Sequence, residues 1–409
     1  MTRRIRLGVL AIVGVGAVGG ACSSAAPGPS TTRYSLGPGL SGVGALPAAA
    51  SGWPEAGFDA RHSSATTATG PQTAHVRWRR ALGADATPGP VLGTDGTILA
   101  ATNAGVLHDL DPRTGADVWI YDGHGSFGSD LSTSPAVIAG GGILWPGPHD
   151  TLFALSAHGR LLWSESFAGQ VLSPAVAGHH RVYVADLAGH LTALEVTATG
   201  HRRVWAVSVG GTDYASPTVG RDGSIYTASD HDLVAVRDLG SRGQVLWRFH
   251  TRKMIEVSNA VAPNGDVVLG TNHDKEYGVR PDGNPAWSVD IGDYTYSSST
   301  VGRDGLAYFG DNMGRVRVLD TTTGTVKQTI APLKAGSEKV WTSIVADAKG
   351  DFYWATTQGH VYGYTAAGHQ LFHLDVGAGV NSYPALGADG TLYLGTGAGT
   401  LVAIGPGSD

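Results

Sequence analysis

The sequence predicts an all-β protein, an eight-bladed β-propeller of four-stranded blades, on three observations. A short phrase recurs eight times, at intervals of 45, 39, 43, 42, 40, 45 and 40 residues. This period is the length of one four-stranded propeller blade. Each interval repeats the same order of strands and turns, and an unattached strand near the N-terminus complements the last, incomplete interval.

The recurring phrase marks the start of each blade. It is clearest at residues 134–137 and 173–176, both Ser-Pro-Ala-Val, and at residues 216–219, Ser-Pro-Thr-Val. Degenerate copies begin at Gly89, Ser258, Ser298, Ser343 and Tyr383. Together these copies predict eight blades.

Each interval reads as four strands separated by tight turns. The first turn holds a dipeptide such as Asp95-Gly96, which tolerates the positive φ of a tight hairpin. A second strand follows, as at residues 224–229, and then a third, as at residues 190–194. Their alternating, β-branched and aromatic residues favour pleated strands. The fourth strand carries a tryptophan in five units, at Trp119, Trp163, Trp205, Trp247 and Trp287.

The eighth interval ends after three strands, at residues 401–404. The strand predicted at 76–82, which contains Trp78, reads as a fourth strand without a blade of its own. Pairing this strand with the last three closes the ring and leaves no open radial edge. We therefore predict one propeller domain over residues 76–405, closed by strand 76–82.

Composition agrees with this fold and excludes one class of partner. The chain has 61 Gly and 20 Pro, with 15% charged and 42% hydrophobic residues. That is ample material for an apolar core and too many turn formers for a helical protein. No basic stripe or arginine-rich run is present, so we expect no nucleic-acid partner.

Residues 1–21 are predicted to be a lipoprotein signal peptide. Three arginines precede the apolar stretch 7–18, which is too short to span a membrane. The small residues before Cys22, the single cysteine, resemble a bacterial lipobox, so we predict a lipid anchor on Cys22. Gly19 departs from the aliphatic residue usual in a lipobox. An ordinary signal peptide with an incidental cysteine is the alternative.

Residues 22–52 are predicted to form a flexible tether rich in Pro, Gly, Ser and Ala. Removing the signal with its three arginines leaves 25 basic against 34 acidic residues, a net charge of −9. Because of the predicted signal peptide and the lipid anchor on Cys22, the protein is expected to cross the cytoplasmic membrane and to remain attached to a membrane face, at the cell surface or in a periplasm.

The repeat resembles the pyrroloquinoline-quinone (PQQ)-like repeat of quinoprotein-like propellers. The closest single copy is residues 111–119, Asp-Pro-Arg-Thr-Gly-Ala-Asp-Val-Trp, and residues 53–75 resemble the lead-in that precedes such propellers. The resemblance implies that the recurrent tryptophans, Trp78 included, dock between neighbouring blades. Two positions depart from the pattern, Gln328 and Phe372, so we expect blades six and seven to be less tightly tied.

The resemblance implies two functional branches. One contains quinone-dependent dehydrogenases with calcium and PQQ in the central funnel, and the other contains scaffolds such as BamB, the lipoprotein of the outer-membrane barrel-assembly machinery. The dehydrogenases are longer and often use a disulfide between adjacent cysteines, which this chain cannot form because lipidation would use its single cysteine, Cys22. We therefore predict no PQQ or calcium and favour a non-enzymatic, monomeric scaffold that binds a protein or envelope component. A dehydrogenase, or a lyase or lactonase with its site in the funnel, is the alternative.

The predicted binding surface is the face that carries the blade-to-blade connections. These connections are long and varied, and they share a face with the turns between second and third strands. Aromatic residues mixed with charge favour a protein interface. The candidates just ahead of the repeat anchors are Asp130, Tyr214, Lys253, Glu256, Tyr294, Tyr296, Lys339, Trp341 and Asn381. The alternative is that Tyr296 and Trp341 plug the top of the channel.

Three of the second-to-third turns carry a His-Asp pair, with the histidines at His149, His231 and His273. Imidazole and carboxylate suit zinc or copper, which makes these histidines weak metal candidates. The alternative is solvated polar turns in related repeats, on blades too far apart to share an ion.

Overall fold

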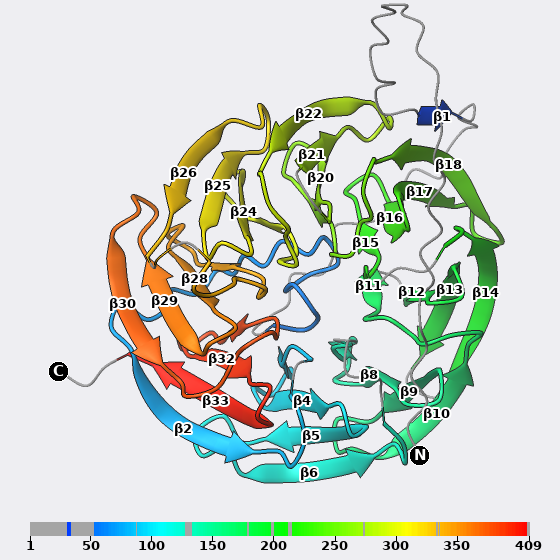
Figure 1. The fold of residues 1–409 in the computed structure, drawn as a ribbon. Coiled ribbons are helices and arrows are strands. Elements are labelled where there is room, and N and C mark those ends of the chain that lie inside the picture. The colour runs from blue at the N-terminus through cyan, green and yellow to red at the C-terminus, as the bar shows by residue number, and fades with distance from the viewer. Residues whose placement is uncertain are drawn as a thin grey trace, which may run out of the picture.

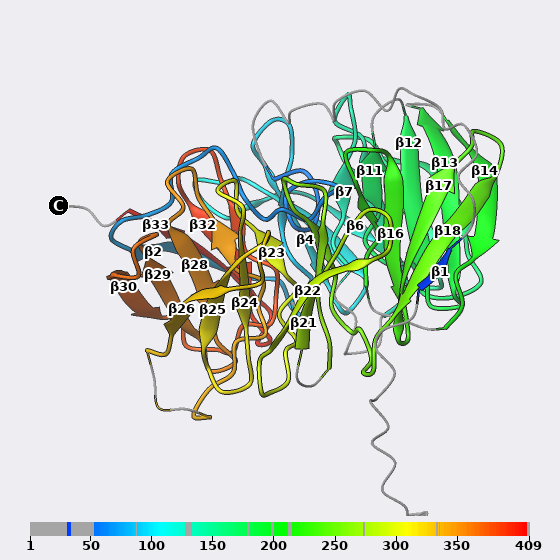
Figure 2. The same cartoon turned by 90° about the horizontal axis from the view of Figure 1, so that it is seen from above.

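The computed structural model describes residues 31–33, 53–86, 88–126, 133–177, 180–197, 200–211, 215–272, 275–332, 334 and 336–406. The chain forms an all-β ring of eight four-stranded antiparallel blades, as the sequence predicts (Figure 1). Figure 2 shows the ring from its edge, with the strands of each blade running between the two faces. The described part of the chain has no helix with the length and apolarity to cross a membrane.

The first four blades follow one another along the chain. Blade 1 comprises β3 (Val91–Leu92), β4 (Ile98–Thr102), β5 (Val106–Leu110) and β6 (Asp117–Asp122), and blade 2 comprises β7 (Ala136–Val137), β8 (Ile143–Gly147), β9 (Thr151–Leu155) and β10 (Leu161–Ser166). Blade 3 comprises β11 (Ala175–Ala177), β12 (Arg181–Asp186), β13 (His190–Thr197) and β14 (Gly200–Ser208). Blade 4 comprises β15 (Thr218–Val219), β16 (Ser224–Ser229), β17 (Asp232–Asp238) and β18 (Gly243–His250), with β1 (Thr31–Arg33) paired to β18.

The other four blades complete the ring. Blade 5 comprises β19 (Ala260–Val261), β20 (Val267–Gly270), β21 (Lys275–Val279) and β22 (Pro285–Asp290), and blade 6 comprises β23 (Thr300–Val301), β24 (Leu306–Gly310), β25 (Val316–Asp320) and β26 (Val326–Ile330). Blade 7 comprises β27 (Val345–Ala346), β28 (Phe352–Ala355), β29 (His360–Tyr364) and β30 (Gln370–Asp375). Blade 8 comprises β31 (Ala385–Leu386), β32 (Leu392–Gly395), β33 (Thr400–Gly405) and β2 (His75–Ala81).

The ring closes in blade 8, where β2 pairs antiparallel with β33 (Figure 1). The closing strand predicted at 76–82 is confirmed and lies at His75–Ala81. Burial follows position in the blade. The second strands are buried at every residue except the first residues of β12 and β24, whereas β2 alternates between exposed and half-buried residues. Neighbouring blades cover both faces of an inner strand, and the outermost strand faces solvent on one side.

One irregularity recurs in every blade, a register shift between the third and fourth strands at the residue before the tryptophan position. In blade 4, for example, Trp247 lies opposite Ala235 and Val245 lies opposite Val236. A β-bulge inserts one residue and re-aims the side chains that follow it. In every blade, the bulge lies next to the side chain at the tryptophan position, where that side chain turns toward the next blade.

Five indole N–H groups donate across a blade boundary to the third-to-fourth turn of the next blade or to the strand end beside it. In each case a glycine of that turn lies under the ring, where a Cβ would come within 2.8 Å. The donor–acceptor pairs are Trp78 to Pro112 O (2.9 Å), Trp119 to Ala157 O (3.0 Å), Trp205 to Asp238 Oδ1 (2.9 Å), Trp247 to Pro281 O (2.9 Å) and Trp287 to Thr321 O (2.7 Å).

The other three blades differ from this pattern at the tryptophan position. Trp163 stacks on His201 with ring centroids 3.9 Å apart. Gln328 lies over Gly368 of blade 7. Phe372 faces blade 8, whose outer strands come from opposite ends of the chain, so no hairpin turn joins them to offer a carbonyl. Phenylalanine, which has no N–H to satisfy, suits this seam.

The lead-in segment, residues 53–70, crosses the middle of the ring (blue in Figure 1). Its groups accept hydrogen bonds, blade after blade, from the ends of the innermost strands of blades 1 to 7. Six acceptors are carbonyls, with donors Leu92 to Trp53 (2.8 Å), Val137 to Pro54 (2.7 Å), Val219 to Ala60 (2.6 Å), Val261 to Arg61 (3.0 Å), Val301 to Ser63 (3.2 Å) and Ala346 to Ser64 (2.9 Å). Blade 3 instead uses the Glu55 carboxylate, which accepts from Val176 N at 3.0 Å.

The lead-in segment lies at the face formed by the first-to-second turns, here called the lead-in face. Trp53 is buried against blades 1, 7 and 8, and His62 is buried among the inner strands. Burial lowers the pKa of His62 to about 4, against the raising effect of Asp59. Nothing in the composition of residues 53–75 predicted this path.

Candidate functional site

The opposite face, here called the connection face, carries the blade-to-blade connections beside the second-to-third turns. Backbone hydrogen bonds tie the two together, because Asn312 N donates to Tyr294 O at 3.1 Å and Thr357 N donates to Lys339 O at 3.0 Å. Each connection is thereby held against the turn of its neighbour. The loops on this face are fixed supports for the side chains they present.

Four of the predicted residues come together between blades 5 and 7, and we call them the aromatic patch: Tyr294, Tyr296, Lys339 and Trp341. The rings of Tyr294 and Tyr296 are nearly parallel with centroids 6.3 Å apart, and Tyr296 meets Trp341 edge-on at 5.2 Å. Lys339 Nζ lies 4.7 Å from the centroid of Trp341. Tyr296 is 38% exposed, a large value for an aromatic side chain in this protein.

The backbone under the aromatic patch is fixed by buried hydroxyl groups. Thr295 Oγ1 donates to Gly310 O at 2.7 Å, and Ser297 Oγ donates to Thr342 O at 2.8 Å, so the connection from blade 5 is bonded to blade 6 and to the connection that follows blade 6. The Trp341 indole N–H donates to Asn312 Oδ1. Three rings are therefore held in place before any partner arrives, which reduces the entropy lost on binding.

The anchor serines of the repeat surround the axis on this face. Ser216 N donates to Ser258 Oγ and Ser258 N donates to Ser298 Oγ, both at 3.1 Å, so each hydroxyl links its blade to the preceding one. Ser298 Oγ in turn lies 2.7 Å from the hydroxyl of Tyr383, which reaches past blade 7. Among these anchors it is Tyr383 that links blade 8 to blade 6.

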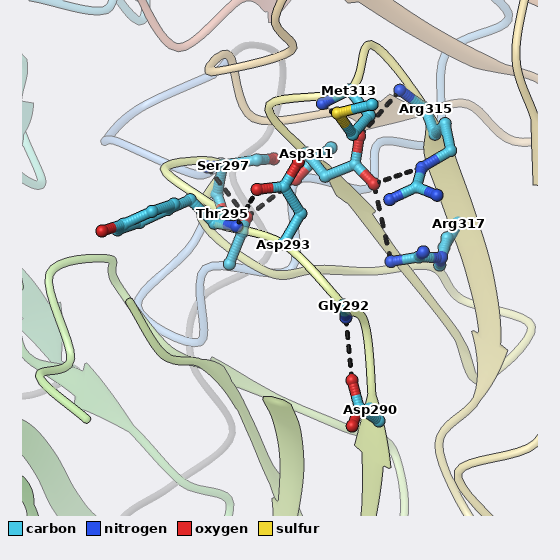
Figure 3. Close-up of polar contacts among 11 residues, drawn as sticks. Asp290, Gly292, Asp293, Thr295, Ser297, Asp311, Met313, Arg315 and Arg317 are labelled. Atoms are coloured by element: carbon cyan, nitrogen blue, oxygen red, sulfur yellow. Dashed lines mark hydrogen bonds and ion pairs between the residues drawn. The ribbon is translucent and has the colours of Figure 1, made fainter. Parts of the chain in front are cut away.

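A buried charged network lies beneath the aromatic patch. Asp311 accepts from Met313 N and Arg315 N at 2.9 Å each, and its Oδ2 lies 2.7 Å from Arg315 Nε and 3.5 Å from Arg317 Nη1 (Figure 3). Glu276, fully buried in β21, is the second acid near Arg317. The two acids, Asp311 and Glu276, and the two arginines, Arg315 and Arg317, lie at the boundary between blades 5 and 6.

Glu276 stands where the other seven blades have leucine or valine: Leu107, Leu152, Leu191, Leu233, Val316, Val361 and Leu401. Burial raises its pKa to about 8, against the lowering effects of the Ser299 hydrogen bond (3.3 Å) and of Arg317. A Cβ on Gly270 would lie 2.6 Å from Glu276 Oε1 and 2.8 Å from Thr295 Cγ2. The acid therefore sits directly under the connection that carries the aromatic patch.

The remaining predicted binding residues do not join this group or cannot be placed. Lys253 is exposed and Glu256 half-buried in the connection between β18 and β19, and Asn381 is exposed between β30 and β31. Asp130, Tyr214 and the lipidation candidate Cys22 lie outside the described residues.

The metal candidates are not brought together. His149 Nε2 lies 2.9 Å from His124 O in blade 2, and His231 lies 6.0 Å from the ring of His250 in blade 4, whereas His273 falls outside the described residues. Within the described ranges, no three His, Cys, Asp or Glu side chains converge as a metal site. Calcium favours several oxygen ligands, and no such cluster of carboxylates is found there. The absence of PQQ and calcium stays a prediction.

Sequence reasoning missed Glu276 and the path that the lead-in segment takes across the ring. Aligning the eight repeats exposes Glu276, because a carboxylate replaces an aliphatic residue at one blade of eight. For the lead-in segment no such signal exists, since its carbonyl groups bind backbone N–H groups and any residue type can supply them.

Comparison with known proteins agrees with the repeat. Residues 103–237 match the family model described as outer membrane protein assembly factor BamB. No curated protein matches the chain in sequence. Similar solved structures include BamB from Moraxella catarrhalis, with 14% identity, a TM-score of 0.64, and 81% of this chain and 100% of that chain covered.

Other similar structures include an enzyme. Quinohemoprotein alcohol dehydrogenase from Comamonas testosteroni has 14% identity, a TM-score of 0.71, and 88% and 82% of the two chains covered. Sqt1 from Saccharomyces cerevisiae has 13% identity, a TM-score of 0.66, and 83% and 100% covered. At these identities the likeness shows the fold alone.

Proposed function

We propose that this chain is a non-catalytic scaffold that binds a protein partner through the aromatic patch. The proposal is supported by its eight-bladed propeller fold and by the match of residues 103–237 to the BamB family model. The fold leaves the choice between scaffold and enzyme open, since one propeller hosts both. The observation that carries the proposal is the exposed Tyr296, held between Tyr294 and Trp341 on a hydrogen-bonded support.

The chemistry of the aromatic patch suits a protein interface. Tyrosine and tryptophan supply large, rigid, amphipathic contact area and dominate the energetic centres of interfaces. Lys339 adds a cation over the ring of Trp341, so the patch favours a partner segment with apolar side chains beside a carboxylate. The patch lies on the connections that join blades 5, 6 and 7.

The proposed location follows from the N-terminus. A lipid on Cys22, followed by the tether to residue 52, would hold the propeller outside the cytoplasmic membrane and leave the connection face free to meet an envelope protein. Cys22→Ala should move the protein from the membrane fraction to the soluble fraction. Unchanged membrane partitioning would contradict the predicted lipid anchor. Partner binding by the aromatic patch is tested by a separate experiment.

The test of binding is capture from a detergent-solubilised envelope by the full chain. The double substitution Tyr296→Ala with Trp341→Ala should abolish capture of the partner that the wild-type chain retains. The control is Val118→Ala with Ile120→Ala, which removes the exposed apolar side chains of β6 on the outer circumference. Equal capture by the patch variant and the wild type would show that binding occurs elsewhere.

A further inference from the structure

A cavity of about 210 Å³ lies on the lead-in face, away from the aromatic patch. One wall is the lead-in segment, with Phe58 and Arg61, and the other is formed by the ends and first-to-second turns of blades 4 to 6. The proposed partner surface on the opposite face does not use this cavity.

Two arginines stand symmetrically at the cavity on either side of blade 5. Arg221 and Arg303 each follow by two residues the innermost-strand valine that donates to the lead-in segment. Both side chains line the cavity and both residues are exposed. Among the described residues, neither arginine has a carboxylate within ion-pair distance.

The carboxylates next to these arginines are occupied by their own turns. Asp222 accepts from Ser224 N and Ser224 Oγ, at 3.1 and 2.8 Å, and Asp304 accepts from Leu306 N at 3.1 Å. Asp222 and Asp304 keep their negative charge, and the two guanidinium groups place positive charge at the cavity in a chain whose net charge is −6.

A third guanidinium, that of Arg61, is oriented from the lead-in segment. Asp59 Oδ2 accepts from Arg61 Nε at 3.1 Å and from Nη2 at 2.7 Å, which leaves Nη1 as a free donor. Arg61 is also fixed by its backbone, because its carbonyl accepts from Val261 N at 3.0 Å. Its side chain is 29% exposed, so it remains within reach of a ligand.

The backbone at the cavity is strained. Phe58 has φ of 78°, and His62 and Ser64 have φ of 50° and 44°. A bulky non-glycine residue with positive φ is a true outlier, and such strain concentrates at binding and catalytic sites. Phe58, which carries this strain, lines the cavity together with Val261 and Val301.

We propose that this cavity binds a small organic anion, a carboxylate or phosphate ester that carries a ring or a short branched chain. The arginines supply paired N–H donors that match carboxylate or phosphate oxygens. Phe58, Val261 and Val301 receive the apolar part. An apolar cavity of roughly 150 Å³ holds benzene, so the volume here admits one ring with its anionic group.

The test measures binding to the full chain by isothermal titration calorimetry, with phenyl phosphate and benzoate as anionic probes and benzyl alcohol as the neutral one. We expect the anions to bind and the alcohol not to bind. Arg221→Ala and Arg303→Ala should each weaken binding roughly tenfold, as loss of a charge-assisted hydrogen bond does. Arg113→Ala is the control, because that side chain is 82% exposed on another turn.

Three outcomes would overturn the proposal: no binding of either anion, equal binding of benzyl alcohol, or equal weakening by Arg113→Ala. Vesicles containing phosphatidic acid separate two sources of the same phosphate chemistry. Vesicle binding that Arg221→Ala and Arg303→Ala abolish would identify a lipid headgroup as the ligand. Binding of the soluble probes without vesicle binding would identify a free anion. Capture of a partner by the aromatic patch is unaffected by either result.

Discussion

The two faces of the ring, built from the same repeats, are stabilised in different ways. On the lead-in face, residues 53–70 bond to the innermost strands of blades 1 to 7, and five indole N–H groups donate to groups at or beside the outer turns. On the connection face, side chains tie neighbouring loops together, and the exposed rings of the aromatic patch stand over a buried charged network.

This difference separates stability from recognition. Backbone hydrogen bonds to the lead-in segment and indole hydrogen bonds between blades hold the blades together at both the inner and the outer circumference of this end. The connection face then contributes less to the stability of the ring. Its loops can therefore carry aromatic and charged residues that bind a partner. A rigid scaffold with varied loops is where binding usually resides.

Removing the lead-in segment should have the largest effect on stability. A chain truncated to begin at residue 75 keeps β2 but loses seven hydrogen bonds to the inner strands and the buried Trp53. We expect a loss of about 5 kcal/mol or more in the free energy of unfolding, measured by chemical denaturation. A truncation that begins at residue 31 is the control and should unfold like the mature chain. Equal unfolding of both truncations would show that the lead-in face is not locked by this segment.

Replacing Glu276 should have the next largest effect, with the opposite sign. Its folded pKa of about 8 lies above its ordinary value, so the native state holds a proton that the unfolded chain has released between about pH 4.5 and 8. The stability of the wild type should therefore fall as pH rises through this window. Glu276→Leu, which restores the residue type of the other blades, should stabilise by on the order of 1–3 kcal/mol at pH 8.5.

Glu276→Gln serves as the companion of that variant. It keeps the size and polarity of the side chain and removes its titration, so the difference between wild type and variant should vanish near pH 4.5 and grow toward pH 8. Denaturation curves at several pH values would check this. A difference that does not change with pH would mean that Glu276 is ionised in the native state throughout.

The positions at which a tryptophan docks between blades allow a paired test, with a smaller expected change in the free energy of unfolding. Trp287→Phe removes the donor to Thr321 O and leaves that carbonyl unpaired, which should cost about 1–2 kcal/mol. Phe372→Trp at the blade 8 seam, where no hairpin turn offers an acceptor, should give no stabilisation. If both substitutions change the melting temperature by similar amounts in opposite directions, ring size rather than the indole hydrogen bond explains the repeat.

The smallest effect is expected on the connection face. Tyr296→Ala with Trp341→Ala should change the free energy of unfolding by less than about 1 kcal/mol, since Tyr296 is exposed and Trp341 half-buried. Circular dichroism and melting would measure it. A loss as large as that of Trp287→Phe would mean that the aromatic patch supports the ring and is not reserved for a partner.

The sequence alone determined the architecture, because its determinants are local. Asp-Gly turns, strand lengths and the spacing of tryptophans recur within each interval, and the lone strand with Trp78 predicted the closure between β2 and β33. It also predicted four residues that meet in the aromatic patch, because residues just ahead of the anchors lie on neighbouring connections of one face. Local sequence patterns were sufficient to predict both the architecture and the residues of the aromatic patch.

Only the tertiary structure decided what lies between blades. The path of residues 53–70 depends on carbonyl groups, which carry no residue-specific signal. The cavity joins Arg61 to Arg221 and Arg303, residues more than a hundred positions apart in sequence, and Glu276 meets Arg317 only across a blade boundary. Such groups come together because the ring curves and closes, and the geometry of that closure is a property of all eight blades at once.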